Sequence, residues 1–233
     1  MLLGARQFFE RRGGGGWVNP YVTDGLVAMW DGEWNAGGGV HDANATVWKD
    51  LVGTNDLRLY GNCAFADNRL ILSRSDSDAA YVKADDATVV SSANGMTIEY
   101  VFRPVGFHNY SALVQFLPYS QSREGWIYSD GRCVPLRWGS GKGVFLVSND
   151  EDVYAAAVID NSNFKMKYYK NAVETSSGIV AANKTENCTM SFFGENGYFF
   201  WGDAYAMRLY NRALTAAEIA ANYAIDKARF NLP

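Results

Sequence analysis

The sequence predicts an all-β fold, a two-sheet antiparallel jelly-roll sandwich followed by one short C-terminal helix. From residue 25 onward, about a dozen short segments rich in β-branched and aromatic residues follow one another, separated by Gly, Asn, Asp and Ser. Several alternate apolar and polar residues, as Lys165, Met166, Lys167 and Tyr168 do, which is the period of a half-buried strand. The regular alternation of strands and helices that a parallel α/β fold requires does not occur.

The expected strands run in order along almost the whole chain. They cover residues 25–31, 56–62, 69–74, 79–83, 96–104, 110–116, 125–129, 143–148, 153–160, 164–171, 188–194 and 203–211.

The helix at the end of the chain carries its own start signals. Thr215 and Glu218 form a capping box, in which each side chain satisfies an unpaired backbone N–H at the start of the helix. Leu214 and Ile219 have the spacing of a hydrophobic staple across that start. We expect this helix to pack against one sheet or to cover an exposed sheet edge.

The chain divides into a short head and one large domain. Residues 1–16 end in four consecutive glycines, which is typical of a flexible tether, so we expect a docking or disordered segment there. Residues 17–233 are expected to form a single domain, since 233 residues with 48% hydrophobic content can bury a full core.

The charge pattern and hydropathy exclude two classes of partner. The formal charge is -4 at pH 7, with acidic and basic residues interspersed, so a footprint for nucleic acid is not expected. No run approaches the roughly 18 apolar residues of a membrane span. Residues 1–12 also lack the apolar core of a signal peptide, which leaves the cytoplasm, another export route or an assembled particle as locations.

Three stretches of the sequence resemble one family. "DAYAMRLYNRAL" (203–214) followed by "TAAEIAANY" (215–223) resembles the closing strand and helix of the laminin-G-like, concanavalin A-like jelly-roll domains. The opening "DGLVAMWDGE" (24–33) with "WKDLVGTNDLRLYGN" (48–62), and "FKMKYYKNAVE" (164–174) in the middle, are similar to other parts of that family. The resemblance implies a curved jelly roll and, for many members, carbohydrate or protein ligands, with calcium near the sheet rim in some. The overall style also resembles proteins encoded by bacteriophages and prophages of gut bacteria.

The sequence does not favour catalysis. A retaining glycosidase needs two carboxylates about 5–5.5 Å apart, and the jelly-roll glucanases place theirs in a Glu-x-Asp-x-x-Glu arrangement that this chain lacks. Glu99 stands alone in its segment, and the adjacent acids of residues 150–152 would point to opposite faces or lie in a turn. We therefore expect a protein that is not an enzyme, although carboxylates could still meet from separate strands.

A calcium site is a second possibility. Asp42, Asp50 and Asn55 are candidate ligands, because hard oxygen donors of this kind suit calcium. The alternative is that these side chains cap turns through their own backbone.

Five aromatic residues in loops are the candidates for a sugar-binding surface. Sugars stack on exposed aromatic rings and take hydrogen bonds from nearby polar groups. The candidates lie near glycines or in polar loops, and they are Trp34, Tyr119, Trp126, Trp138 and Trp201. The alternative for each is ordinary packing inside the sandwich, where Trp30 and Trp48 are expected.

These observations lead to three hypotheses. The first is a non-enzymatic module of a phage virion or extracellular surface that binds glycans or proteins of a bacterial host, with residues 1–16 contacting other virion subunits. The second is a structural or decoration protein that makes only protein contacts, which a symmetric homo-oligomer would favour. The third is a glycoside hydrolase, which a cleft with two carboxylates would indicate.

Overall fold

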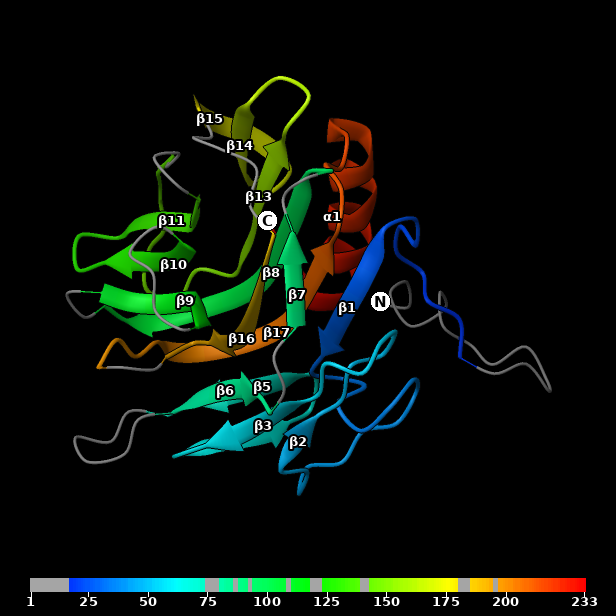
Figure 1. Cartoon of the computed structure of the whole chain (residues 1–233). Coiled ribbons are helices and arrows are strands. Elements are labelled where there is room, and N and C mark those ends of the chain that lie inside the picture. The colour runs from blue at the N-terminus through cyan, green and yellow to red at the C-terminus, as the bar shows by residue number, and fades with distance from the viewer. Residues whose placement is uncertain are drawn as a thin grey trace, which may run out of the picture.

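The fold is the predicted antiparallel sandwich with a C-terminal helix. A computed structural model describes residues 17–73, 80–85, 88–91, 94–107, 110–117, 123–138, 143–179, 185–194 and 197–233. The expected head, residues 1–16, and the candidate Tyr119 lie outside these ranges. Within them the chain forms strands β1 to β17 in two sheets and ends in helix α1 (Figure 1).

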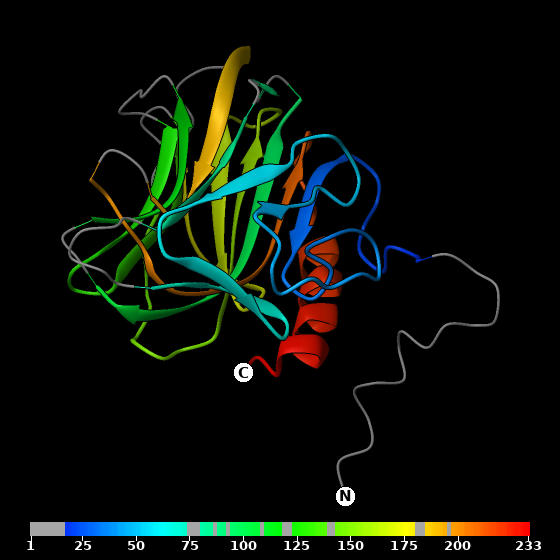
Figure 2. The ribbon, with the colours of Figure 1, turned by 90° about the horizontal axis from the view of Figure 1, so that it is seen from below.

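The first sheet carries the helix on its outside (Figure 2). Its strand order is β15 (Val173–Ile179), β14 (Lys165–Lys170), β13 (Val153–Asp160), β8 (Met96–Gly106), β17 (Trp201–Tyr210), β5 (Arg69–Leu72) and β4 (Cys63–Ala66), with β1 (Leu26–Asp31) also paired to β17.

The second sheet lies opposite and contains the strands on the left of Figure 1. Its order is β12 (Phe145–Leu146), β11 (Arg132–Trp138), β10 (Arg123–Tyr128), β9 (Tyr110–Leu117), β16 (Thr185–Phe192), β6 (Tyr81–Ala84), β3 (Leu57–Tyr60) and β2 (Val47–Trp48), with β7 (Thr88–Ser91) also paired to β16. We call the face of this sheet that points away from the first sheet the outer face.

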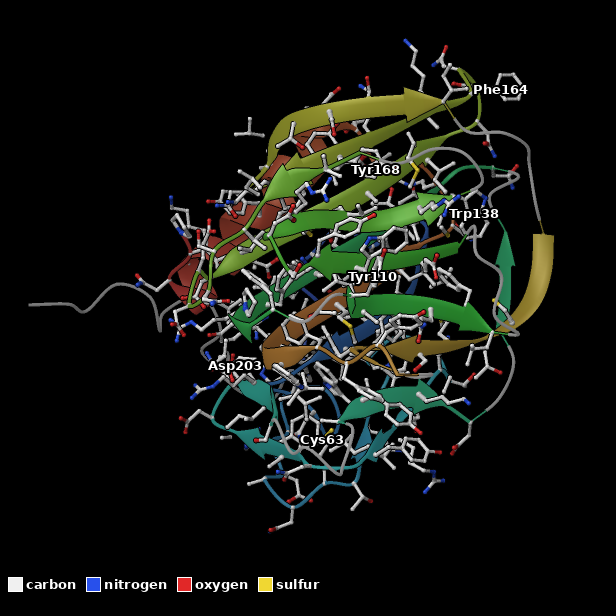
Figure 3. The ribbon with its side chains drawn as sticks, turned by 90° about the vertical axis from the view of Figure 1, so that its left-hand side faces the viewer. Cys63, Tyr110, Trp138, Phe164, Tyr168 and Asp203 are labelled. Carbon is white, nitrogen blue, oxygen red and sulfur yellow. The ribbon has the colours of Figure 1, made fainter. Side chains whose placement is uncertain are left out.

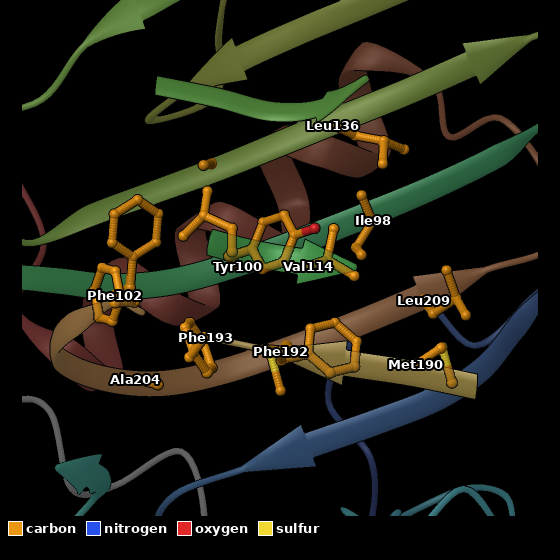
Figure 4. Close-up of a cluster of buried hydrophobic side chains, with 14 of the residues drawn as sticks. Ile98, Tyr100, Phe102, Val114, Leu136, Met190, Phe192, Phe193, Ala204 and Leu209 are labelled. Carbon is orange, nitrogen blue, oxygen red and sulfur yellow. The ribbon is translucent and has the colours of Figure 1, made fainter. Parts of the chain in front are cut away.

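The main core fills the space between the two sheets. Aromatic and aliphatic side chains from both sheets meet there, among them Tyr100, Phe102 and Phe192 (Figure 4). Trp30 and Trp48 are fully buried in this core, as predicted. Close packing of such large side chains supplies the main driving force for the fold.

A second core lies between the first sheet and α1 (Ala216–Phe230). Along β13, Val153, Ala155 and Ala157 face the main core, while Tyr154 and Ala156 face the helix. Both faces of this strand are therefore buried, which explains its continuous apolar run. The helix thus packs on a sheet face, the first of the two predicted placements.

The predicted capping box of α1 is present. The Thr215 side chain accepts a hydrogen bond from the Glu218 backbone N–H, and the Glu218 carboxylate accepts one from the Thr215 N–H. Arg212 adds an ion pair to Glu218 at 2.6 Å. This arginine, together with the capping hydrogen bonds, lowers the pKa of Glu218 to about 2.

Fully buried charges connect the helix to the sheet. Arg208 on β17 pairs with Glu99 on β8 and with Asp226 on α1, and all three side chains have no exposed surface. Asn222 on α1 donates to both Glu99 oxygens at 3.1 Å. Tyr21 donates to Asp226 at 2.7 Å, so the first described segment is also bound to the last helix. Across the described residues, no helix combines the length and the apolar character that a membrane crossing requires.

A candidate ligand-binding face on the second sheet

A cavity of about 280 Å³ opens on the outer face of the second sheet. Figure 3 views this face, with Tyr110 near its centre. The lining comes from three neighbouring strands and from the segment before β17, and consists of Tyr110, Ala112, Gln115, Glu124, Gly125, Trp126, Tyr128, Arg137 and Tyr198.

The pairing of β10 with both of its neighbours is irregular beside the cavity. The pairing of β10 shifts register between Gly125 and Trp126 against β9, and between Glu124 and Trp126 against β11. A Cβ atom at Gly125 would lie 2.2 Å from the backbone oxygen of Pro135, so only glycine allows the strands to approach this closely. Residues two apart in an extended strand share a face, and Glu124 and Trp126 both line the cavity.

Aromatic rings form one wall of the cavity. The ring centroid of Tyr110 lies 5.3 Å from that of Tyr128, 5.8 Å from that of Tyr198 and 6.5 Å from that of Trp126. Trp126 and Tyr128 also meet edge to face at 5.9 Å. Tyr110 is 44% exposed and Tyr198 37% exposed, so two rings of this group remain open to a ligand.

Two buried polar atoms of the lining have no partner among the residues that the structure describes. They are the Trp126 Nε1, which is a donor, and the Gln115 Oε1, which is an acceptor. Trp126 is only 8% exposed and Gln115 only 2%. A buried polar group without a partner costs about 1–3 kcal/mol, so a ligand that reached these two atoms and paired with them would gain free energy.

The charges around the cavity balance one another. Glu124 and Arg137 occupy directly opposed positions on β10 and β11. Beside them, Arg132 forms an ion pair of 2.8 Å with Asp130, and its guanidinium lies 4.6 Å from the centre of the Tyr128 ring. The described lining therefore contributes one charge of each sign and no net charge.

Of the five predicted aromatic residues, the structure places Trp126 in this cavity. The structure corrects the prediction that Trp34 and Trp138 belong to a sugar-binding surface. Trp34 is only 6% exposed, its ring meets that of Trp17 edge to face at 5.4 Å, and the Arg229 guanidinium lies 4.0 Å from the centre of its ring. Trp138 is 2% exposed and packs against Phe116 inside the sandwich. Neither ring is available for stacking.

Trp201 lies apart from the others, in a second cavity of about 440 Å³ at one end of the first sheet. A Cβ at Gly106 would lie 3.4 Å from its ring, at ordinary van der Waals distance. Asp203 borders the same cavity and pairs with Arg69 at 3.2 Å. Burial raises the pKa of Asp203, while Arg69 and Arg103 oppose that shift.

The predicted calcium ligands serve as turn caps. The Asp50 Oδ1 accepts from the Met29 and Val52 backbone N–H groups, and its Oδ2 accepts from the backbone and side chain of Asn55. Asp42 closes a separate turn through Asn35 and Asn44. The described residues hold no group of three or more His, Cys, Asp or Glu side chains placed to bind a metal. The calcium site therefore stays a prediction.

The candidate carboxylates lie in separate places. Glu99 is sealed beneath α1, where its Oε1 accepts from Tyr154 at 2.5 Å. Asp150 lies in a turn, while Glu151 and Asp152 pair with Lys170 and Arg103. Among the described lining residues of the outer-face cavity, Glu124 is the one carboxylate.

Sequence reasoning missed most of the cavity. Tyr110 and Gln115 lie in a strand that was predicted, but the alternation of that strand does not reveal which rings remain exposed. Tyr128 follows Trp126 by two residues and therefore shares its face, which is a signal that could have been used. Arg137 lies in β11, a strand that the sequence did not predict.

Comparisons with known proteins show the fold alone. The sequence matches no protein-family model and no curated protein sequence. Among solved structures, Trypanosoma rangeli sialidase in complex with the inhibitor DANA matches with a TM-score of 0.65 and 14% identity over 89% of this chain and 35% of that chain. This chain therefore spans about a third of the length of the sialidase.

Two further structures match at similar levels. One is domain 4 of AbnA, a GH43 extracellular arabinanase from Geobacillus stearothermophilus in complex with arabinotriose, with a TM-score of 0.61 and 16% identity over 85% of this chain and 98% of that chain. The other is the binding domain of botulinum neurotoxin serotype G, with a TM-score of 0.62 and 11% identity over 87% of this chain and 51% of that chain. At such identities the shared feature is the β-sandwich.

Proposed function

We propose that this chain is a non-enzymatic, carbohydrate-binding β-sandwich module whose binding site is the outer-face cavity around Trp126. One observation carries the proposal. Two exposed tyrosine rings line the cavity, and two other lining residues contain a buried donor and a buried acceptor that have no partner among the described residues.

The chemistry of a sugar matches these groups. A sugar hydroxyl both donates and accepts, so neighbouring hydroxyls can accept from the Trp126 Nε1 and donate to the Gln115 Oε1. The C–H face of a sugar ring is apolar and stacks on an aromatic ring such as Tyr110. A mostly preformed pocket with a few convergent polar groups is the usual form of a small-ligand site.

The structural likenesses support the same class of ligand. Domain 4 of AbnA matches this chain over nearly all of its own length, and that domain holds arabinotriose. The sialidases support it less strongly, because this chain spans only about a third of their length. The fold alone hosts unrelated functions, so the proposal depends on the cavity.

The described part of the cavity favours binding over hydrolysis. Most glycosidases of both stereochemical types use two carboxyl groups, about 5–5.5 Å apart in retaining enzymes and about 6.5–9.5 Å apart in inverting ones, whereas sialidases use a tyrosine nucleophile. Here the described lining offers Glu124 and, directly opposite, the basic Arg137. This arrangement supports a binding module.

The biological setting that we propose comes from the sequence resemblance. In this setting the module belongs to a phage virion, binds glycans on a bacterial host, and is attached to other virion subunits through residues 1–16. The competing hypothesis is a structural virion protein whose aromatic residues are covered by subunit contacts.

An array of bacterial and plant glycans, probed with the full-length chain, tests the proposal. We expect saturable binding that Trp126→Phe weakens, because this change keeps an aromatic ring and removes the Nε1 donor. Tyr110→Ala should weaken it further, while Trp201→Phe at the second cavity serves as the matched control. Thermal melts of each variant identify losses that come from unfolding.

Two results would argue against this function. If the wild-type chain bound no glycan on the array, the result would favour the structural hypothesis. Binding that Trp126→Phe and Tyr110→Ala leave unchanged would move the site elsewhere on the molecule.

A further inference from the structure

We propose that β15, the strand at one edge of the first sheet, pairs antiparallel with β15 of a second copy of this chain about a two-fold axis, and so forms a homodimer. The contact lies on a different sheet from the outer-face cavity. The oligomeric state does not depend on a sugar ligand, so this inference goes beyond the proposed function and can fail separately from it.

β15 is the longest strand at any end of the two sheets. It pairs with β14 on one side, and no described strand pairs with its other side. β15 has seven residues, whereas β4 has four and β12 and β2 have two each. The backbone N–H and C=O groups along an open edge are free to pair with another strand. The longest open row of such groups therefore lies on β15.

The sequence of β15 has little of the usual protection against edge pairing. Proteins protect edges with lysine, proline, buried charges or bulges. β15 contains no lysine and no proline, and five of its seven residues are exposed. Its one charged residue, Glu174, is engaged with Lys167 of β14 at 3.4 Å. A bulge is present at Thr175, but the residues from Ser176 to Ile179 beyond it pair regularly with β14. This regular half is open to a partner.

Large apolar side chains are exposed at both ends of β15. Val173 is 66% exposed at one end and Ile179 is 73% exposed at the other. Phe164, 55% exposed, lies beside Ile179, because the next residue of the chain pairs with Ile179 (Figure 3). Leu146, 65% exposed, lies beside Val173, because its carbonyl accepts from the lysine that pairs with Val173. Exposed apolar side chains that gather in one place often mark an interaction site.

A two-fold antiparallel contact brings these apolar ends together. In such a pair, the beginning of each strand lies beside the end of the other, and every contact occurs twice. The end of one copy that carries Val173 and Leu146 therefore lies beside the end of the partner that carries Ile179 and Phe164. Apolar surface leaves water in the same contact that pairs the open backbone groups.

The charge pattern of the edge fits a second copy of the same strand. Glu174 lies near one end of β15, so the two Glu174 side chains of a dimer lie on opposite sides of the two-fold axis. The residues nearest the axis, Ser176, Ser177 and Gly178, are small and uncharged. A partner strand for this edge needs an uncharged middle and apolar residues at its ends, and β15 itself meets both requirements.

Such a dimer leaves the candidate binding face open. β9, β10 and β11, which supply most of the cavity lining, belong to the second sheet, whereas β15 extends the first. Each dimer therefore presents two cavities, and two linked sites bind a surface that carries many copies of a ligand more tightly than one. The two-fold contact differs in this respect from the structural hypothesis, in which subunit contacts cover the aromatic residues.

Sedimentation analysis of the full-length chain, from low micromolar to submillimolar concentration, tests the inference. We expect a monomer–dimer equilibrium. Ser177→Glu should weaken the dimer by about ten-fold, because it places two like charges near the axis. Within each copy the new carboxylate lies opposite Lys167, the strand partner of Ser177, so the fold should tolerate it. Thr54→Glu, at an exposed position between β2 and β3, adds the same charge away from the edge and should leave the equilibrium unchanged.

Disulfide cross-linking tests the position of the axis. Ser177→Cys should form a disulfide between two copies under mild oxidation, because the two introduced thiols lie close together near the axis. Thr54→Cys should not, and the wild type controls for the three native cysteines. Melting curves show that each variant is folded.

Two results overturn this inference. One is a wild-type chain that stays monomeric at every concentration, which would leave the edge to a different protein. The other is a dimer that Ser177→Glu and Thr54→Glu affect equally, which would place the contact elsewhere. Neither result touches the proposed function, because a single cavity can bind a sugar without the dimer.

Discussion

The Nε of Arg208 lies 2.5 Å from the Oε2 of Glu99, and neither side chain has any exposed surface. The same guanidinium forms an ion pair with Asp226 on α1 and lies 4.0 Å from the centre of the Tyr21 ring. One arginine of the first sheet thus holds a neighbouring strand, the C-terminal helix and the first described segment together.

Arg208→Met should destabilise the protein by about 3–5 kcal/mol. The change leaves Glu99 and Asp226 buried without their cation, and an uncompensated buried charge is more costly than the loss of the pair itself. Chemical denaturation of both proteins measures the difference. Arg58→Met removes the exposed partner of Asp85 and should shift the denaturation midpoint little, because exposed ion pairs contribute little to the free energy of unfolding. A small effect of Arg208→Met would mean that water reaches this network.

Tyr21→Phe should loosen the first described segment. The Tyr21 hydroxyl donates to Asp226 at 2.7 Å and accepts from Arg229 at 2.5 Å, and burial raises the pKa of this phenol. Losing both bonds in a buried site should cost about 1–3 kcal/mol. Hydrogen exchange should show faster exchange of the Val22 amide, which donates to Asn222 at 3.0 Å. Unchanged exchange there would show that the ring alone holds the segment.

Gly125→Ala should damage the cavity and the sheet together. Its Cβ would lie 2.2 Å from the Pro135 oxygen, so β10 and β11 would have to separate. Overpacking of this kind typically costs about 1–3 kcal/mol. Thermal melts and sugar titration should both show a loss. Gly37→Ala is a contrasting change, since a Cβ there meets nothing within 4 Å although its φ of 136° adds strain. Wild-type sugar affinity in Gly125→Ala would contradict the role of the bulge in positioning Trp126.

Glu218→Gln should lower stability at neutral pH and have a smaller effect in acid. The pKa of Glu218 is lowered from 4.5 to about 2, chiefly by Arg212, so its charged form contributes stability above pH of about 4.5. That contribution is lost as the pH falls toward 2 and the carboxylate is protonated. Melting temperatures at neutral pH and near pH 3 should therefore show a smaller gap between wild type and variant in acid. A difference in melting temperature that stays constant with pH would contradict a stabilising role of the Glu218 charge.

Asp50→Ala should destabilise the protein by about 2 kcal/mol whether or not calcium is present. Four N–H donors lose their acceptor when the carboxylate is removed, and three of them belong to the backbone. Melts of the wild type with calcium and with a chelator should coincide, because the Asp50 oxygens already accept these bonds. A clear calcium-dependent rise in melting temperature, lost in the variant, would restore the predicted metal site.

The sequence alone was sufficient to predict features that depend on residues close together in the chain. Thr215 and Glu218 lie three residues apart, so the capping box and the start of α1 could be predicted from local chemistry. Most predicted strands are present, because apolar runs between turn residues carry a local signal. The strands that the sequence did not predict were missed for local reasons as well. β11 contains Pro135 and two arginines, and β15 is almost entirely exposed, so neither strand has the usual apolar pattern.

The candidate site depended on the tertiary structure. Whether an aromatic ring is core or surface depends on which strands lie above it, and that is why Trp34 and Trp138 turned out buried while Tyr110 stayed exposed. The Trp126 cavity joins β9, β10, β11 and a segment before β17, and the register of β9 and β10 shifts beside it. Local sequence encodes the period of each strand, whereas the pairing and register of distant strands emerge only when the whole core packs.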